Sequence, residues 1–368
     1  MHLARHTKVT RLSRMPQLFD PLEIRGVTFR NRIGVSPMCQ YSSQDGFASD
    51  WHLVHLGSRA VGGAALVVAE ATAVSAIGRI SPGDLGIWKD EHVSELARIA
   101  HFLEAQGAVA GIQIAHAGRK ASTARPWDGG QAIADEAGGW QPVAPSALAF
   151  GEHYRLPREL RVSEIAQVRE EFRAAALRAK KAGFRYLELH AAHGYLLHSF
   201  LSPLSNQRTD EYGGSFENRT RLVLEVARTL REVWPEEHVL GVRLSCTDWQ
   251  AGGWSIEDTV KLAQALEQEK VDVIDCSSGG NLAKANIPVG PGYQVPFAEA
   301  VKHATQLRVA AVGLITEATQ ANSIIEQGQA DLVFMARAML RDPYLALNAA
   351  RALKHQPAPV PKQYARAH

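Results

Sequence analysis

Short apolar runs rich in β-branched residues alternate with longer amphipathic stretches along this chain, and the alternation repeats eight times. The apolar runs lie at residues 32–36, 65–70, 110–115, 186–190, 239–245, 271–276, 309–313 and 331–335. Each run is followed by a helical pattern. In the stretch that begins at Asp90, apolar side chains recur on one helix face at Val93, Leu96, Ala100 and Leu103. The pattern predicts eight strand-helix units.

The strand candidates are nearly continuous apolar segments, such as Val271-Asp272-Val273-Ile274. Such segments are typical of parallel strands that are buried on both faces, whereas a sandwich shows alternation and hairpin turns. No hairpin dipeptide separates two strand candidates. We therefore predict an α/β fold, a (β/α)8 TIM barrel. An eight-stranded open sheet remains an alternative, because periodicity does not show that the first and last strands pair.

The length of 368 residues and a hydrophobic content of 46% suit one large barrel with loop insertions. Two connections are unusually long, residues 116–162 after the third strand and 193–218 after the fourth. Both follow strands and so belong to the C-terminal face, where barrel enzymes build their sites. We predict a single domain over residues 18–368. Residues 1–17 are expected to be a disordered extension.

The net charge of +2, with both signs interspersed, offers no extended basic face for a nucleic acid. No apolar run of about 18 residues could span a bilayer. Cys39, Cys246 and Cys276 are too few for a disulfide framework and favour a reducing compartment. The first fourteen residues lack the apolar segment of a secretory signal. We expect a cytoplasmic protein that acts on small molecules and binds neither nucleic acid nor membrane.

Polar residues gather where the predicted strands end, although the interior of a barrel is apolar and polar groups there need a reason. After the first six strands, those that stand out are Cys39, Tyr41, Gln113, His116, His190, His193, Tyr195, Arg243, Ser245 and residues 276–280. Strands seven and eight end in Gly313 and in Ala336-Arg337, where many barrels bind phosphate through backbone N–H groups. The pattern indicates a phosphorylated ligand.

Other ligands fit the pattern less well. No G-x-G-x-x-G follows a strand, and no P-loop occurs. His190 and His193 have a spacing that suits zinc, as have His52 and His55, but the first strand supplies Cys39 where a metal hydrolase typically carries two histidines. A Schiff-base aldolase needs a lysine at a strand end, and no strand candidate ends in one. We therefore predict no metal.

Several motifs carry a resemblance that spacing alone does not supply. They are LFDPL (18–22), RNRI (30–33), PMCQY (37–41), EATAV (70–74), QIAHAGRK (113–120), HAAHGYL (190–196) and NQRTDEYGGS (206–215). On these motifs the chain resembles the Old Yellow Enzyme family, in particular its bacterial branch of NADPH dehydrogenases, ene-reductases and xenobiotic reductases. The match runs in family order over nearly the whole chain.

The resemblance implies that flavin mononucleotide (FMN) lies across the barrel mouth. The phosphate would bind the backbone of Gly313 and Ala336 and the side chain of Arg337, although close relatives carry glycine in place of Ala336. Arg243 would stabilise the negative charge that develops around N1 and the C2 carbonyl when the flavin is reduced. The remaining flavin contacts implied are Gln113 and Ala71 at the pyrimidine edge, and Pro37, Met38 and Cys39 on the N5 side.

The resemblance also implies roles in substrate reduction. His190 and His193 would donate hydrogen bonds to a substrate carbonyl, and Tyr195 would protonate the α carbon. Tyr41 would contact the substrate, and Cys39 would tune the flavin potential rather than act as a nucleophile. Without the resemblance, the histidines are as well explained as core residues, and the tyrosine is better explained as a packing residue.

The implied activity is that of an FMN-dependent NADPH dehydrogenase, or ene-reductase. It would reduce the C=C bond of α,β-unsaturated carbonyl compounds and related electrophiles by ping-pong hydride transfer through flavin N5, with NADPH preferred to NADH. Arg366 in the tail resembles an arginine that enters the neighbouring subunit's site, which implies a homodimer or homotetramer. Lys120 belongs to a matched motif but receives no role. A non-enzymatic binding module would not need Arg243 together with paired carbonyl donors.

Overall fold

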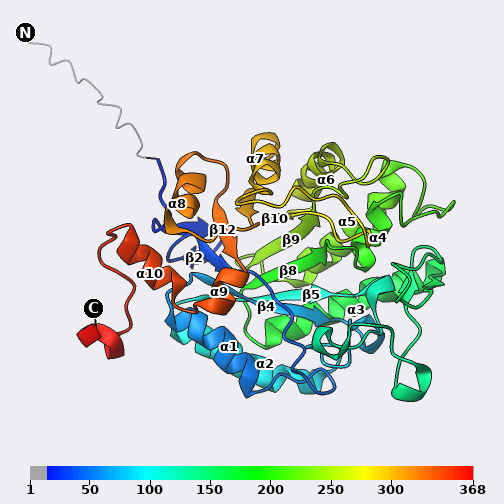
Figure 1. The fold of residues 1–368 in the computed structure, drawn as a ribbon, viewed down its shortest axis with the longest axis horizontal. Coiled ribbons are helices and arrows are strands. Elements are labelled where there is room, and N and C mark those ends of the chain that lie inside the picture. Colours follow the sequence, from blue (N-terminus) through cyan, green and yellow to red (C-terminus); the bar gives the residue numbers. More distant parts are fainter. Residues whose placement is uncertain (1–14, 368) are drawn as a thin grey trace, which may run out of the picture.

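The computed structural model describes residues 15–367, which form a closed barrel of eight parallel strands (Figure 1). In barrel order the strands are β3 (Ile33–Val35), β4 (Leu66–Ala73), β5 (Val109–Ala115), β8 (Tyr186–Ala191), β9 (Val239–Ser245), β10 (Val273–Ser277), β11 (Arg308–Ala311) and β12 (Leu332–Met335). The last strand pairs with the first, with Phe334 opposite Gly34. The predicted barrel is therefore confirmed, and the open sheet is excluded.

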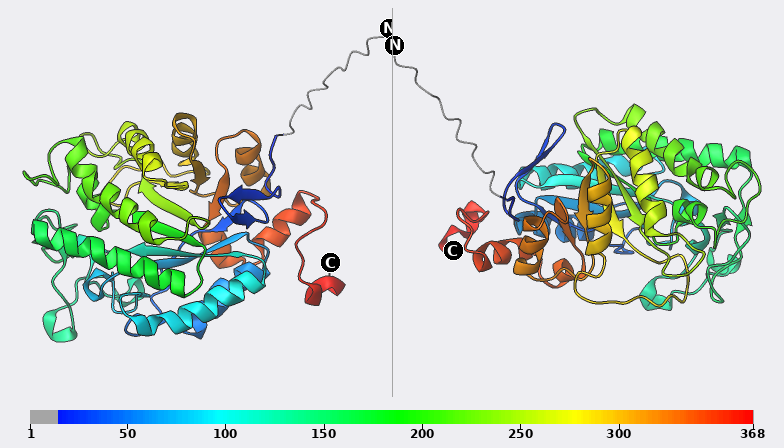
Figure 2. Two further views of the ribbon diagram at one scale, coloured as in Figure 1. Left: turned by 180° about the vertical axis from the view of Figure 1, so that it is seen from behind. Right: turned by 90° about the horizontal axis from the view of Figure 1, so that it is seen from above.

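Helices surround the strands, as the amphipathic stretches predict (Figures 1 and 2). They are α1 (Asp50–Val61), α2 (Val93–Ala105), α3 (Val162–Lys181), α4 (Leu196–Leu201), α5 (Phe216–Val233), α6 (Ile256–Gln268), α7 (Val295–Ala304), α8 (Ala318–Glu326), α9 (Arg337–Arg341) and α10 (Leu345–Ala352). Beyond α10, the exposed turn η6 (Lys362–Ala367) stands off the barrel. No helix within residues 15–367 is long and apolar enough to cross a membrane.

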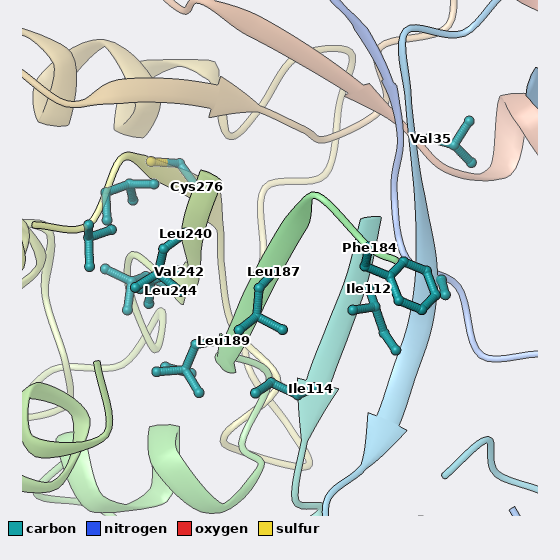
Figure 3. Packing of buried hydrophobic residues seen from close by; sticks show 14 of the residues in the cluster. Val35, Ile112, Ile114, Phe184, Leu187, Leu189, Leu240, Val242, Leu244 and Cys276 are labelled. Carbon is teal, nitrogen blue, oxygen red and sulfur yellow. The ribbon is translucent and has the colours of Figure 1, made fainter. Parts of the chain in front are cut away.

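Alternation along each strand separates an outer apolar layer from the barrel interior, because successive side chains of a strand point to opposite faces. Leu187 and Leu189 of β8 and Val242 of β9 belong to the buried cluster packed between strands and helices (Figure 3). The residues between them, including Glu188 and Arg243, therefore face the interior. Because Leu187 and Leu189 pack on the outer face of the strand, the side chain of Glu188 between them points into the barrel.

A hairpin that the sequence analysis missed lies before the barrel. It consists of β1 (Leu22–Ile24) and β2 (Val27–Phe29), joined by a turn at Arg25-Gly26 in which Arg25 has φ 51°. Its buried side chains share a core cluster with Tyr186 and Val239, the first residues of β8 and β9. The hairpin therefore covers the N-terminal ends of these strands, so within residues 15–367 that end of the barrel is filled by side chains.

The two long connections contain short elements. Residues 116–161 hold the turns η3 (Gly118–Lys120), η4 (Pro126–Asp128) and η5 (Asp135–Ala137), and the paired strands β6 (Val143–Ala144) and β7 (Arg158–Glu159). The second connection holds α4, all of whose side chains are buried. Two further turns are η1 (Ala76–Gly78) and η2 (Asp90–His92). Of the predicted N-terminal extension, residues 1–14 lie outside the described residues.

Candidate active site

The register of the parallel strands brings polar side chains of four strands together inside the barrel. Gln113 of β5 lies opposite Glu188 of β8, and His190 of β8 lies opposite Arg243 of β9. Arg243 in turn lies opposite Asp275 of β10. Residues that are paired across neighbouring strands point to the same face of the sheet. These side chains therefore form one contiguous polar group inside the barrel. Three of its members, Gln113, His190 and Arg243, are among the site residues predicted from the sequence.

His190 and His193 lie in contact at the mouth, with the His193 Nδ1 atom 3.4 Å from the His190 Nε2 atom. The Ala192 N–H donates to His190 Nδ1, at 3.2 Å, so the neutral His190 ring carries its proton on Nε2. The His193 Nε2 atom lies 2.7 Å from the Ser277 Oγ atom. Burial, followed by the charge of Arg243, lowers the pKa of both imidazoles well below the usual value. Both rings are therefore neutral N–H donors at neutral pH.

Two buried carboxyl groups, Glu188 and Asp275, lie near the Arg243 guanidinium, and Asp275 is in contact with it. The Arg243 Nε atom lies 2.9 Å from an oxygen of Asp275. Glu188 accepts hydrogen bonds of 2.7 Å from both the Gln113 amide and the Tyr186 hydroxyl. Burial raises the pKa of both Glu188 and Asp275, while Arg243 lowers it. When either Glu188 or Asp275 is protonated, the group formed by these two acids and Arg243 is close to neutral.

A cavity of about 270 Å³ opens beside this group, over β9 to β12. Its lining includes seven residues that stand out in the sequence, His193, Arg243, Ser277, Ser278, Gly313, Ala336 and Arg337. It also includes residues that the analysis did not name as site residues, Tyr293, Gln294, Thr316, Phe334 and Arg341. The cavity thus joins the interior guanidinium to an exposed pair of arginines at the far end, an arrangement suited to a long anionic ligand.

The cavity wall at Gly313 requires glycine. Gly313 has φ 124°, and a Cβ atom there would lie 2.8 Å from the Gln294 Nε2 atom. The Gln294 side chain is itself fixed, because its Nε2 donates to the Val312 carbonyl over 3.0 Å and its Oε1 accepts from Ser278. Ala336 has φ −105° and ψ −95°, so it does not adopt the left-handed conformation that favours glycine. Backbone at both positions can therefore approach a ligand closely.

The remaining predicted residues lie on the β3 to β5 side. Pro37, Met38 and Cys39 follow β3 and are partly exposed, and Ala71 of β4 is 7% exposed. Burial and nearby acids raise the pKa of the Cys39 thiol well above its usual value, so the thiol stays protonated at neutral pH. A protonated thiol is a poor nucleophile.

Tyr195 follows His193 and packs edge-on against His190, with ring centroids 4.9 Å apart. Burial raises the pKa of its phenol, which is therefore protonated at neutral pH. Tyr41 packs edge-on against the exposed Trp127. Arg366 lies in the exposed turn η6, so its predicted role in a neighbouring subunit's site stays a prediction.

Glu188, Asp275 and the contacts of Lys120 were not predicted from the sequence. Counting alternate residues along β8 and β10 would have identified both acids. Each acid lies between two apolar residues that point outward, so its own side chain points inward. Lys120 carries no such signal, because η3 belongs to an irregular loop. Among residues 15–367, no group of three or more His, Cys, Asp and Glu side chains could hold a metal ion.

Known proteins match this chain over most of its length. Residues 17–356 match the NADH:flavin oxidoreductase / NADH oxidase family. The NADPH dehydrogenase of Bacillus velezensis is 47% identical over 353 residues, 95% of this chain and 99% of that protein. The NADPH dehydrogenase of Geobacillus sp. is 48% identical over 338 residues, covering 91% of this chain and 94% of its own.

Solved structures share the fold. Morphinone reductase in complex with tetrahydroNAD has a TM-score of 0.76 and 29% identity, with 92% of this chain and 91% of that chain covered. A 2-naphthoyl-CoA reductase complex has a TM-score of 0.83 and 26% identity over 93% of this chain, which spans 52% of the reductase. Fold and matches together define a flavin-dependent oxidoreductase of the Old Yellow Enzyme type. The chain belongs to the NADH:flavin oxidoreductase / NADH oxidase family, as the sequence resemblance indicates.

Proposed function

We propose that this protein is an FMN-dependent NADPH dehydrogenase that reduces the C=C bond of α,β-unsaturated carbonyl compounds and related electrophiles. The observation that carries the proposal is the neutral pair His190 and His193, of which His193 lines the same cavity as Arg243. NADPH as the reductant is suggested by the names of the curated relatives.

The residues around the cavity suit FMN. Arg337 and the backbone at Gly313 and Ala336 would hold the phosphate, because the cavity offers a guanidinium and close backbone approach there. Arg243 would lie at the pyrimidine end, where the paired Asp275 leaves the local charge near neutral. The other proposed flavin contacts are Gln113, Ala71, Pro37, Met38 and Cys39. When bound, FMN supplies a carrier that accepts hydride from the nicotinamide and passes it to the acceptor.

The histidines would activate the acceptor. Each neutral ring has one N–H, and two N–H groups aimed at a carbonyl oxygen withdraw electrons from the conjugated C=C bond. The β carbon then becomes electrophilic, and the negative charge that builds on the oxygen is stabilised. His193 would exchange its contact with Ser277 for the substrate, and the Nε2–H of His190 would exchange its contact with His193 Nδ1.

Tyr195 would supply the proton to the α carbon, for which a phenol that stays protonated at working pH is suited. The partly exposed Tyr41 would contact the acceptor. The protonated thiol of Cys39 would tune the flavin potential without forming a covalent bond.

Residues 15–367 form one barrel with no second nucleotide-binding domain. NADPH and the acceptor would therefore use the same open end of the barrel in turn, which gives ping-pong kinetics. Arg366 would complete the site of a neighbouring subunit in a homodimer or homotetramer. We place the protein in the cytoplasm, in line with its three free cysteines.

Absorbance spectroscopy of the purified protein tests the proposal. We expect a flavin spectrum that NADPH bleaches without oxygen and that 2-cyclohexen-1-one restores. Replacing His190 and His193 with alanine should slow the restoration by enone far more than the bleaching, since only the acceptor needs a polarised carbonyl. The matched control is His101→Ala, at an exposed position of α2.

Two results would contradict the proposal. A colourless protein that does not take up added FMN would show that FMN is not its cofactor. If the histidine variants slow bleaching and restoration equally, with the His101 variant unaffected, then His190 and His193 do not polarise the acceptor carbonyl.

A further inference from the structure

Lys120 connects three loops at the barrel mouth. It ends η3, directly after β5, and its ammonium donates hydrogen bonds to the His193 carbonyl over 2.9 Å and to the Gly280 carbonyl over 3.0 Å. His193 belongs to the connection after β8 and Gly280 to the one after β10. One side chain therefore spans the connections of three strands directly above the polar group of the barrel.

No carboxylate in the described part of the chain forms an ion pair with Lys120. Its ammonium instead lies 4.2 Å from the ring centroid of Phe150 and 5.3 Å from that of Tyr195. Carbonyl dipoles and aromatic faces thus compensate the charge. Burial, followed by the charge of Arg119, lowers the pKa of Lys120 to about 8. An ammonium kept in such surroundings at a cost in solvation needs a reason beyond packing.

The backbone that Lys120 holds is strained. His193 has φ 59°, a left-handed conformation that is unfavourable for residues with a Cβ atom. Its N–H donates to the Ser245 Oγ atom over 2.9 Å, so the residue is fixed at its N–H by Ser245 and at its carbonyl by Lys120. The opposing loop lies so close that a Cβ atom on Gly280 would be 2.7 Å from the His193 Cα atom.

We propose that Lys120 is a positioning residue that clamps the His193 backbone to Gly280 and so aims the His193 imidazole at the acceptor carbonyl. The inference rests on the proposed function. Without the clamp, His193 would leave its left-handed conformation for part of the time, and the acceptor would bind only to the remaining fraction. The charge of Lys120 also opposes protonation of both imidazoles.

The proposal implies a pH dependence. The titratable or charged groups facing Lys120 are Arg119, His190, His193 and Tyr195. As the pH rises through about 8, the ammonium loses its proton and its bonds to the two carbonyls weaken. The affinity for the acceptor should therefore fall above pH 8 in the wild type. In Lys120→Met the affinity should not change over this pH range.

Hydrogen exchange and half-reaction kinetics on the FMN-loaded protein test the clamp. In Lys120→Met we expect the segment 190–196 to exchange about tenfold faster, and the acceptor KM to rise about tenfold, as for the loss of one charge-assisted hydrogen bond. Bleaching at saturating NADPH should change less than twofold. Lys120→Arg should restore most of the protection, and Lys181→Met, at an exposed position of α3, is the matched control.

A folded Lys120→Met protein with wild-type exchange in 190–196, or with a wild-type acceptor KM, overturns the proposal. If methionine prevents folding, Lys120→Gln takes its place: faster exchange supports the clamp, and wild-type exchange overturns it. A wild type that reduces no enone refutes the proposed function instead. The exchange data then still decide whether Lys120 holds His193.

Discussion

Removing the Arg337 side chain should weaken the binding of FMN and leave the binding of riboflavin unchanged. Arg337 begins α9 and lines the end of the cavity remote from His193. No acidic side chain among residues 15–367 forms an ion pair with Arg337, so Arg337→Ala leaves no carboxylate unpaired. The loss therefore equals the attraction between guanidinium and phosphate.

The magnitude follows from the exposure of the arginine. A hydrogen bond to a charged group contributes about 1.5–3 kcal/mol, and the exposed position of Arg337 favours the lower end, about 1.5–2 kcal/mol. The dissociation constant for FMN should thus rise about 10- to 30-fold. Riboflavin lacks the phosphate and should bind wild type and variant equally. Added salt should weaken FMN binding more in the wild type than in Arg337→Ala.

Quenching of flavin fluorescence on titration into the apoprotein measures both constants. Arg173→Ala, at an exposed position of α3, is the matched control for the loss of one arginine. Equal weakening of FMN and riboflavin would show that Arg337 supports the fold or the sugar chain. Unchanged FMN affinity would refute a phosphate site at this end of the barrel.

Three further predictions concern single side chains. Tyr195→Phe should slow reoxidation by enones by about 100-fold, with bleaching by NADPH unchanged, in stopped-flow measurements; an equal effect on both would exclude proton donation. Burial raises the pKa of Glu70 to about 8 in the folded protein, against 4.5 in the unfolded chain. The contribution of this protonated acid to folding stability is therefore complete below pH 4.5 and is lost as the pH rises through 8. In urea denaturation, Glu70→Gln should therefore gain up to roughly 4 kcal/mol relative to wild type between pH 5 and pH 9, and a constant difference would contradict the buried neutral acid. Leu189→Ala should lower the free energy of unfolding by about 3 kcal/mol, whereas Leu177→Ala, at a position 40% exposed, should cost less than about 1 kcal/mol.

The barrel could be predicted from the sequence because each of its strands is a buried apolar run with little competing local preference. The hairpin before it was missed, since its strands are only three residues long and its Arg25-Gly26 turn is not among the commonest hairpin dipeptides. The short helix α4 was missed because it is buried all round and shows no amphipathic period.

The candidate site divides in the same way. His190, Arg243 and Gln113 could be predicted because they end regular strands, and register then brings them together. Lys120 could not be placed, because its contacts depend on how an irregular turn meets two other loops. Nothing in the local sequence encodes such a meeting. Arg366 depends on a second subunit, which one chain does not specify.

The strand register has a consequence for how this enzyme type can change over time. Arg243 lies opposite both His190 and Asp275 because three neighbouring strands are aligned residue for residue. Inserting or deleting one residue in β9 would turn the guanidinium out among the helices and an apolar side chain in, so the interior polar group would lose its cation. Residues 121–149, which lie between Lys120 and Phe150 and outside the barrel strands, are under no such register restriction. Changes in that segment would therefore leave the alignment of Arg243 with its neighbours unaltered.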